Sequence, residues 1–297
     1  MPIPSELQAA LSAPQSNEAL RSLDDAGKLT AWFPGLEAGR GFQQPELHYY
    51  TVLDHCLAAV RAMDELLGDG ESGQALRKEL SWLDIDETLG RDVGGLPLPQ
   101  LLRLSALLHD IAKPETATFV DGRMRFPRHG PRGAETVAER LPELGFGEVA
   151  TDFVRRMVRY HLRPGELVKN WPPTDHAIRR FVTDLDGHVL ALLLVQMADG
   201  WATRGPNYTR EHFRRHCGFA SYVLARAWAV TEVDDPPLIT GEDLMHDLDL
   251  PGGRLLGAVL TSVRDAQLNG SIRERAEALA LAQATLARLR DETAPSG

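Results

Sequence analysis

Apolar residues recur along this chain with the spacing of helix faces. Between residues 98 and 112 they occupy positions 101, 104, 108 and 111, and between residues 147 and 162 they occupy positions 154, 157 and 158. Such three- and four-residue steps place the apolar side chains on one face of an α-helix. Stretches that alternate apolar and polar residues, as half-buried strands do, are almost absent. The pattern predicts an all-α protein.

The same periodicity predicts where the helices lie and where the chain divides. The expected helices cover roughly residues 46–67, 74–82, 98–112, 131–142, 147–162, 174–184, 187–203, 208–230, 253–268 and 272–291. Before them we expect a short helix and then an irregular stretch, and at 121–130 a loop with at most a short extended piece. A stretch rich in proline and acidic residues at 232–237 suggests a boundary. The predicted divisions are an N-terminal segment at 1–45, a main helical domain at 46–231 and a C-terminal helical extension at 232–297.

Composition narrows the classes of protein to consider. The chain has 297 residues, 43% of them hydrophobic and 25% charged, as in ordinary soluble globular proteins. A formal net charge of -10 argues against an extended basic surface for nucleic acid, although it permits a local basic patch. Two cysteines, Cys56 and Cys217, are too few for a disulfide framework and favour the cytoplasm. Neither a membrane span of about 18 uncharged apolar residues nor a signal peptide is expected.

His109 and Asp110 follow a leucine-rich run near the end of the predicted helix 98–112, which Pro114 should terminate. A buried helix does not carry an imidazole and a carboxylate side by side unless something binds them. Together they are common ligands of a divalent metal. The alternative is a capping pair, with the histidine facing the helix C-terminus and the aspartate in solvent. The pair alone leaves both interpretations open.

Three further candidate ligands lie on apolar faces of predicted helices. His55 stands inside an apolar helical stretch, and His161 completes the pattern that begins at residue 154. Asp199 is the only acidic residue near the end of a helix that is apolar nearly all round, where a carboxylate opposes the helix dipole. His48 lies two turns before His55 on the same face, and we interpret it as a core or capping histidine.

The predicted loop 121–130 contains His129 and several arginines. Arg128 precedes the histidine and Arg132 follows it, with two more arginines at positions 123 and 125. Loops held over a site often supply ligands, and arginine binds phosphate through two parallel hydrogen bonds. A surface histidine in a solvated basic loop is the alternative for this segment.

The order of these candidates resembles the HD-domain metal-dependent phosphohydrolases. Their pattern is a histidine, then His-Asp, then a distant aspartate, and members with two metals have two more histidines in between. The residues that match in order are His55, His109, Asp110, His129, His161 and Asp199. Lys113 also matches the family's frequent HD-x-x-K pattern. The resemblance implies an HD-domain helical bundle, here with a C-terminal helical extension.

The resemblance narrows to the HD region of bacterial tRNA nucleotidyltransferases, the CCA-adding enzymes. The segments that carry it are 32–34, 107–114, 121–129, 238–245 and 266–270, so it extends from about residue 30 to 290. No strand-rich region with a Gly-Ser turn and paired aspartates precedes residue 30. We therefore expect the C-terminal half of such an enzyme without its nucleotidyltransferase head, and no CCA addition.

A site of imidazoles and carboxylates suits manganese, iron, nickel, cobalt, zinc or magnesium. We expect two divalent ions with Asp110 between them, and catalytic roles for Asp110 and Lys113. Lys113, Arg128 and Arg132 are expected to hold the substrate phosphate.

The predicted function is hydrolysis of phosphate esters of nucleotides or RNA 3′ ends, with 2′,3′-cyclic phosphodiesterase and phosphatase activities implied by the resemblance. The alternative is a non-catalytic RNA-binding or adaptor protein that keeps the fold and works with a separate nucleotidyltransferase. The resemblance would allow tRNA binding, but the net charge does not support it. The sequence predicts no membrane partner and leaves the oligomeric state open.

Overall fold

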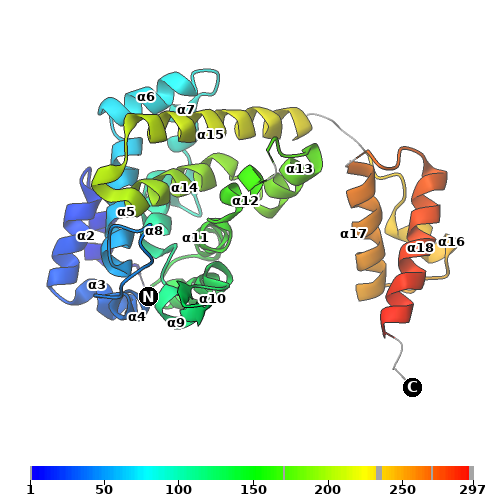
Figure 1. The fold of residues 1–297 in the computed structure, drawn as a ribbon, viewed down its shortest axis with the longest axis horizontal. Helices are drawn as coiled ribbons and strands as arrows, with labels where there is room; N and C mark the ends of the chain where they lie inside the picture. The colour runs from blue at the N-terminus through cyan, green and yellow to red at the C-terminus, as the bar shows by residue number, and fades with distance from the viewer. Residues whose placement is uncertain (1, 170, 232–235, 269, 294–297) are drawn as a thin grey trace. The chain divides into compact units, whose positions relative to one another are not determined.

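The computed structural model describes residues 2–169, 171–231, 236–268 and 270–293, and it confirms the predicted all-α class. Among these residues, the only sheets are two short antiparallel hairpins. The chain divides into two compact units (Figure 1). Unit 1 contains residues 1–170 and 182–224, and unit 2 contains residues 171–181 and 225–297. The predicted boundary at 232 falls outside the described residues, so the domain division stays a prediction.

Unit 1 holds most of the helices and both hairpins. Its helices are α1 (Ser5–Ser12), α2 (Ser16–Asp25), α3 (Lys28–Trp32), α4 (Pro34–Ala38), α5 (Val52–Leu67), α6 (Glu71–Glu79), α7 (Ile85–Leu89), α8 (Leu98–Leu108), α9 (Lys113–Thr116), α10 (His129–Glu143), α11 (Glu148–Tyr160), α12 (Arg163–Lys169), α14 (Val189–Arg204) and the 3-10 turn η1 (Gly205–Asn207). Its strands are β1 (Asp92–Val93), β2 (Leu96–Pro97), β3 (Thr118–Val120) and β4 (Arg123–Arg125). The helices α13 (Asp175–Asp184) and α15 (Arg210–Thr231) are divided between the two units.

The core of unit 1 is built around α8. This helix packs against α5, α11 and α14, while α5 also packs against α14 and α10 against α11 (Figure 1). Apolar side chains on nearly every face of α8 and α14 explain their central positions, because a helix that is apolar all round must be covered on all sides. Burial of these leucines, valines and alanines supplies the main favourable term in folding.

The N-terminal part of the chain is more helical than predicted. The expected irregular stretch contains α3 and α4, each only five residues long, and α2 precedes them. Helices this short give too few periodic positions to be recognised. Phe33 and Leu36 are at most 1% exposed and tie this segment to the core, while Pro34 occupies the start of α4, where its missing N–H costs nothing.

The helix before the His-Asp pair is shorter than predicted. It ends at Leu108 and not at residue 112, and Pro114 lies in the first turn of α9, which begins at Lys113, instead of terminating α8. Between the two helices the chain turns through tight i→i−3 hydrogen bonds, from Ile111 N to Leu108 O and from Lys113 N to Asp110 O. Pro114 has no N–H to donate to the carbonyl of Asp110, and its ring would clash with that carbonyl in a continuous helix, which is a physical reason for this break.

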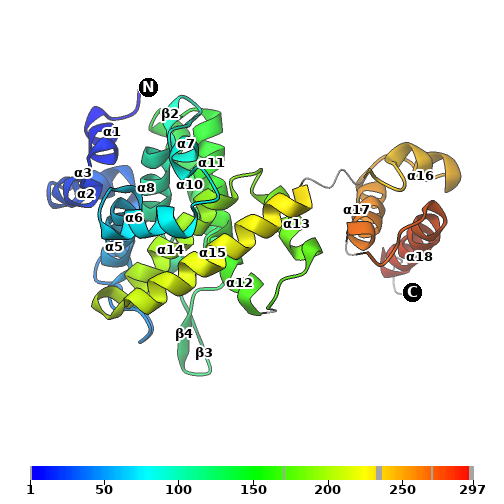
Figure 2. The same cartoon turned by 90° about the horizontal axis from the view of Figure 1, so that it is seen from above.

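The region predicted as a loop contains the strand β4, which pairs with β3 in a hairpin. Asp121 and Gly122 both have positive φ, at 51° and 70°, as a two-residue type I′ turn requires. Val120 therefore pairs with Arg123, and Thr118 with Arg125. Figure 2 shows this hairpin projecting from the helices of unit 1.

Unit 2 has its own apolar cluster, formed by α16 (Gly241–Asp247), α17 (Arg254–Leu268) and α18 (Arg275–Thr293). Leu244, Val259 and Ala282 are fully buried in it. The Thr240 side chain caps the first turn of α16 by accepting the Asp243 N–H, and the Asp243 carboxylate accepts the Thr240 N–H in return. These helices agree with the predicted segments 253–268 and 272–291.

Within the described residues, no single helix has both the length and the apolar character to cross a bilayer. The bent pair formed by Asp175–Asp184 and Val189–Asn207 meets those criteria only when its two parts are taken together. The buried residues of α14 belong to the core around α8.

Candidate metal centre

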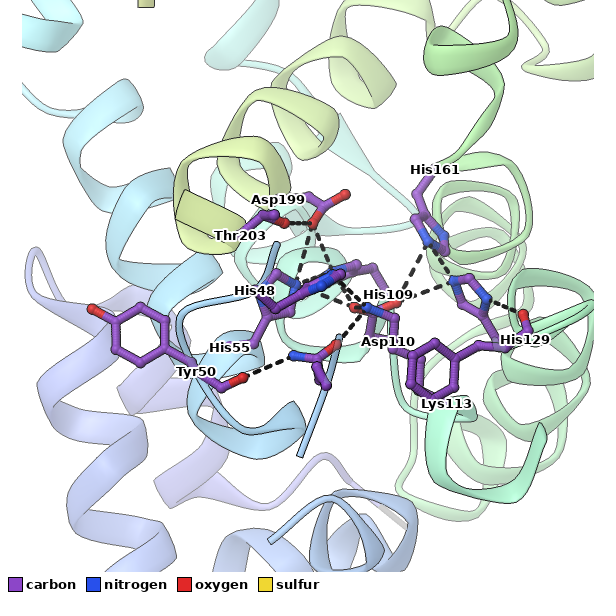
Figure 3. Close-up of polar contacts among 12 residues, drawn as sticks. His48, Tyr50, His55, His109, Asp110, Lys113, His129, His161, Asp199 and Thr203 are labelled. Carbon is purple, nitrogen blue, oxygen red and sulfur yellow. Dashed lines mark hydrogen bonds and ion pairs between the residues drawn. The ribbon is translucent and has the colours of Figure 1, made fainter. Parts of the chain in front are cut away.

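Six candidate ligands predicted from the sequence meet in unit 1 (Figure 3). They come from α5, the ends of α8 and α11, the start of α10, and α14. The first ligand group consists of His55, His109, Asp110 and Asp199, and the second consists of Asp110, His129 and His161. Within each group the candidate ligand atoms all lie within 4.8 Å of one another. Five of the six residues are buried, and the Asp199 side chain is 21% exposed.

Asp110 belongs to both groups because its two carboxylate oxygens face different histidines. Its Oδ2 lies 3.2 Å from His55 Nε2 and 3.1 Å from His109 Nε2. Its Oδ1 lies 3.2 Å from His129 Nε2 and 3.6 Å from His161 Nε2. A carboxylate in this position can give one oxygen to each of two neighbouring cations.

Backbone carbonyls fix the orientation of three of the imidazoles. The Nδ1 atoms of His109, His129 and His161 lie 2.8, 2.8 and 2.7 Å from the carbonyl oxygen of the residue three positions earlier. A carbonyl only accepts, so each Nδ1 carries the proton, and the Nε2 of a neutral ring presents its lone pair to the site. This arrangement is typical of histidines that bind metals through Nε2.

The Nε2 atoms converge in pairs, and the Nδ1 atoms of both His129 and His161 donate to carbonyls, so two neutral rings there would face each other with their lone pairs unless a cation lies between them. His129 Nε2 lies 3.1 Å from His161 Nε2, and His55 Nε2 lies 3.0 Å from His109 Nε2. Among the described residues, neither oxygen of the buried Asp110 carboxylate has a hydrogen bond of good geometry. Facing lone pairs and an unsatisfied buried carboxylate are costly. A divalent cation would satisfy both, so these residues fit such a metal.

The pKa values of the buried groups agree with this picture. Burial lowers the pKa of His161 to about 3, so its ring is neutral. Burial also lowers the pKa of His109, but the carboxylates of Asp110 and Asp199 outweigh it and raise that pKa to about 10. Burial raises the pKa of Asp110, and the positive charges of His109 and Lys113 reverse this and hold it well below its usual value. A proton on His109 thus occupies the position that a metal would take over.

His129 reaches His161 because two glycines let α10 lie against the end of α11. A Cβ on Gly130 would lie 2.9 Å from the carbonyl oxygen of Arg159, and one on Gly133 would lie 3.0 Å from Val158 Cγ1. The prediction that His129 belongs to a loop is wrong, because it is the first residue of α10 and only 6% exposed. The fit of the first turn of α10 against α11 was not visible in the sequence.

Lys113 is held beside Asp110 by a polar network. Its Nζ lies 2.7 Å from Asp110 Oδ2, 2.7 Å from Gln44 Oε1 and 3.2 Å from His48 Nε2 (Figure 3). The ammonium group therefore forms an ion pair with Asp110 and donates hydrogen bonds to Gln44 and His48. His48, interpreted above as a core or capping residue, lies at the edge of the site with its ring 5.6 Å from that of His55. Gln44 lies in a segment without periodicity, so no sequence signal identified it.

The two arginines predicted to hold phosphate differ in their surroundings. Arg132 donates to Glu115 and Glu135, at 2.7 and 3.0 Å. Arg128 is exposed and makes no ion pair within the described part of the chain. Their assignment to substrate phosphate stays a prediction.

Comparison with known proteins agrees with the motif. The HD domain family matches residues 82–186. The A-adding tRNA nucleotidyltransferase of Deinococcus radiodurans is 27% identical over 94% of this chain and 56% of its own length. The CC-adding tRNA nucleotidyltransferase of Thermus thermophilus is 29% identical over 93% of this chain and 54% of its own length. The bifunctional uridylyltransferase/uridylyl-removing enzyme of Novosphingobium aromaticivorans is 30% identical over 48% of this chain and 14% of its own length.

The chain spans about half the length of the two tRNA nucleotidyltransferases that it matches. Both are named for adding only part of the CCA sequence, A in one case and CC in the other, which refines the resemblance to CCA-adding enzymes. Residues 82–186 therefore match the HD domain family, and over most of its own length the chain resembles part of the tRNA nucleotidyltransferases, as its motifs predicted.

Proposed function

We propose that this chain is a metal-dependent phosphohydrolase that acts on nucleotides or RNA 3′ ends, with 2′,3′-cyclic phosphodiesterase and phosphatase activity. The observation that carries the proposal is the placement of Asp110, which gives one carboxylate oxygen to each ligand group. The match to the HD domain, a family of metal-dependent phosphohydrolases, supports this reading. The cytoplasm is the proposed location, because Cys56 and Cys217 are both free and buried.

The two ligand groups would hold two divalent ions, one in each group. When bound, such ions lower the pKa of water and neutralise the oxygens of a phosphoryl group. The chain's own contribution is to hold the imidazoles rigidly through their Nδ1–H donors, which fixes where Nε2 points. The Oγ1 of Thr203 lies 3.2 Å from Asp199 Oδ1 and orients that carboxylate toward His55 in the same way.

Lys113 is the residue best placed to contact a substrate. Its weakest partner is His48, at 3.2 Å, so a non-bridging phosphoryl oxygen would replace His48 most readily. The ammonium would then donate to that oxygen while keeping Asp110 and Gln44. Such a contact strengthens as negative charge builds up in the transition state. Hydrolysis would add water across a P–O bond and give an alcohol and a phosphate.

The names of the similar proteins suggest the class of ester. Two act on tRNA and one removes uridylyl groups, so esters of nucleotides are the common chemistry. A second candidate function follows from the same names, since all three are also nucleotidyltransferases. In that case the chain would be a non-catalytic RNA-binding or adaptor protein that works with a separate nucleotidyltransferase.

Turnover separates the two candidates. Purified protein reconstituted with manganese should hydrolyse 2′,3′-cyclic AMP, 2′-AMP or bis-p-nitrophenyl phosphate, lose this activity with a chelator and regain it on adding metal back. The Asp110→Asn variant, purified in parallel, excludes a contaminating hydrolase. A folded, metal-loaded protein that turns over none of these esters would contradict the hydrolase and favour the adaptor.

A further inference from the structure

Three arginines without ion pairs lie on and beside the β3–β4 hairpin. We call residues 118–128 the basic hairpin, and its arginines are Arg123, Arg125 and Arg128. All three are exposed, and none has a carboxylate partner within the described residues. In a chain with a net charge of -10 acidic partners are plentiful, and Arg132 nearby has two of them. Three unpaired cations on one projecting element (Figure 2) indicate a site for an anionic partner.

The register of the hairpin separates it into two faces. Residues paired across an antiparallel ladder lie on the same face, and successive residues alternate. Arg123 and Arg125 pair with Val120 and Thr118 and therefore share a face. Phe119 lies on the opposite face, and its side chain is 70% exposed. One thin ribbon thus offers cations on one side and an aromatic ring on the other.

The hairpin leads directly into the candidate metal centre. Phe126, the residue after β4, accepts the Nδ1–H of His129 through its carbonyl oxygen, at 2.8 Å. Its ring centroid lies 5.3 Å from Lys113 Nζ. Arg125 directly precedes Phe126 in the chain, and Arg123 lies three residues before Phe126, at roughly 10 Å for about 3.3 Å per residue. The arginine face therefore begins at the site and extends away from it.

We propose that the basic hairpin binds single-stranded RNA whose 3′ end enters the metal centre, so that an oligonucleotide is preferred over a mononucleotide. The arginines would hold successive phosphates, and Phe119 would stack on an unpaired base. A single strand fits better than a duplex, because only unpaired bases are free to stack. The choice of the 3′ end rests on the proposed function, whereas binding by the hairpin does not.

Binding is measured first without turnover. A short, fluorescently labelled single-stranded RNA is titrated with chelator-treated protein, and anisotropy is followed at several salt concentrations. Each phosphate contact on a single strand contributes about 0.7 to the magnitude of the slope of log K against log salt concentration. In the Arg123→Gln/Arg125→Gln variant this slope should therefore be smaller in magnitude by about 1.4. Phe119→Ser should weaken binding roughly 5- to 150-fold, the range for loss of one stacked base.

The matched control is Arg61→Gln on α5. Arg61 is also exposed and without an ion pair in the described residues, but Glu18, Asp64 and Glu65 line the same surface hollow, so RNA should avoid it. The control should bind RNA like the wild type. Absence of RNA binding, or hairpin variants whose affinity and salt slope equal those of the control, would overturn the proposal. A duplex of equal length that binds more tightly than the single strand would also overturn it.

A kinetic comparison separates this inference from the proposed function. With manganese restored, kcat/KM is measured for 2′,3′-cyclic AMP and for an oligonucleotide that ends in a 2′,3′-cyclic phosphate. The ratio of the oligonucleotide value to the mononucleotide value should fall in the arginine variant, chiefly through KM. If neither ester is hydrolysed but RNA binding still depends on the hairpin, the hydrolase proposal fails and the binding surface stands.

Discussion

Gly130→Ala would add one methyl group where the first turn of α10 meets the end of α11. The new Cβ would lie 2.9 Å from the carbonyl oxygen of Arg159, whereas ordinary contacts begin at 3.4 Å. To reach an ordinary contact distance, α10 must move about 0.5 Å away from α11, because the backbone carbonyl of Arg159 cannot rotate away as a side chain does. Constellations of ligands tolerate about 0.5 Å of displacement, and overpacking costs about 1–3 kcal/mol.

We therefore expect Gly130→Ala to lower the free energy of unfolding by about 1–3 kcal/mol and to disrupt the second ligand group. In that group His129 Nε2 and His161 Nε2 lie 3.1 Å apart, and His129 moves with α10. The first ligand group contains no residue of α10, so it should keep its metal. A displacement approaching 1 Å at a catalytic group can lower the rate about 10²-fold, so activity should fall even where the protein folds.

Urea unfolding of metal-free protein measures the change in the free energy of unfolding. Metal analysis after reconstitution with manganese measures how many ions the variant still binds. The matched control is Gly218→Ala in α15, whose Cβ would meet no atom within 4 Å. The free energy of unfolding of that variant should rise by about 0.4–1 kcal/mol, because alanine is a better helix former than glycine. A Gly130→Ala protein with wild-type stability and wild-type metal content would refute the argument that this glycine sets the position of His129.

Two substitutions within the site give further predictions. Asp110→Asn should remove both metals and abolish hydrolysis while far-ultraviolet circular dichroism stays helical, because Asp110 belongs to both ligand groups; full activity in the folded variant would rule out the proposed site. Lys113→Ala should keep the metals but lower kcat/KM by about 10²–10³, as expected for one lost transition-state donor. If metal content falls in step with activity, Lys113 serves to support Asp110, whose Oδ2 lies 2.7 Å away.

Long helices were predictable from the sequence because periodicity needs several turns to be recognised. The segment predicted at 147–162 corresponds to α11 at Glu148–Tyr160, and that at 187–203 to α14 at Val189–Arg204. Several elements of two to five residues were missed, among them α3, α4, α7, α9 and the β1–β2 hairpin, and of the β3–β4 hairpin only a short extended piece was anticipated. The β3–β4 turn did carry a signal, since Asp121-Gly122 is a favoured type I′ pair.

The candidate ligands were identified from the order of histidines and aspartates on apolar helix faces, and the structure brings all six together. Their assignment as metal ligands stays a prediction. What the sequence did not give is the means by which they are held. The carbonyl oxygens that orient His109 and His161 are backbone atoms without a sequence signal. Gln44 reaches the site from a distant segment, and only its contact with Lys113 shows that it belongs there. Thr203 lies one turn after Asp199 in α14, a spacing that is visible in the sequence.

The number of metal ions bound per chain distinguishes a two-metal site from a mononuclear one. The wild type and the variants His129→Ala and His161→Ala are reconstituted with manganese, freed of excess metal and measured by mass spectrometry. We predict two ions in the wild type and about one in each variant, with a steep loss of activity, because Asp110 and the first ligand group remain. A wild type that saturates at one ion, with both variants unchanged, would contradict the two-metal site and leave at most a mononuclear hydrolase.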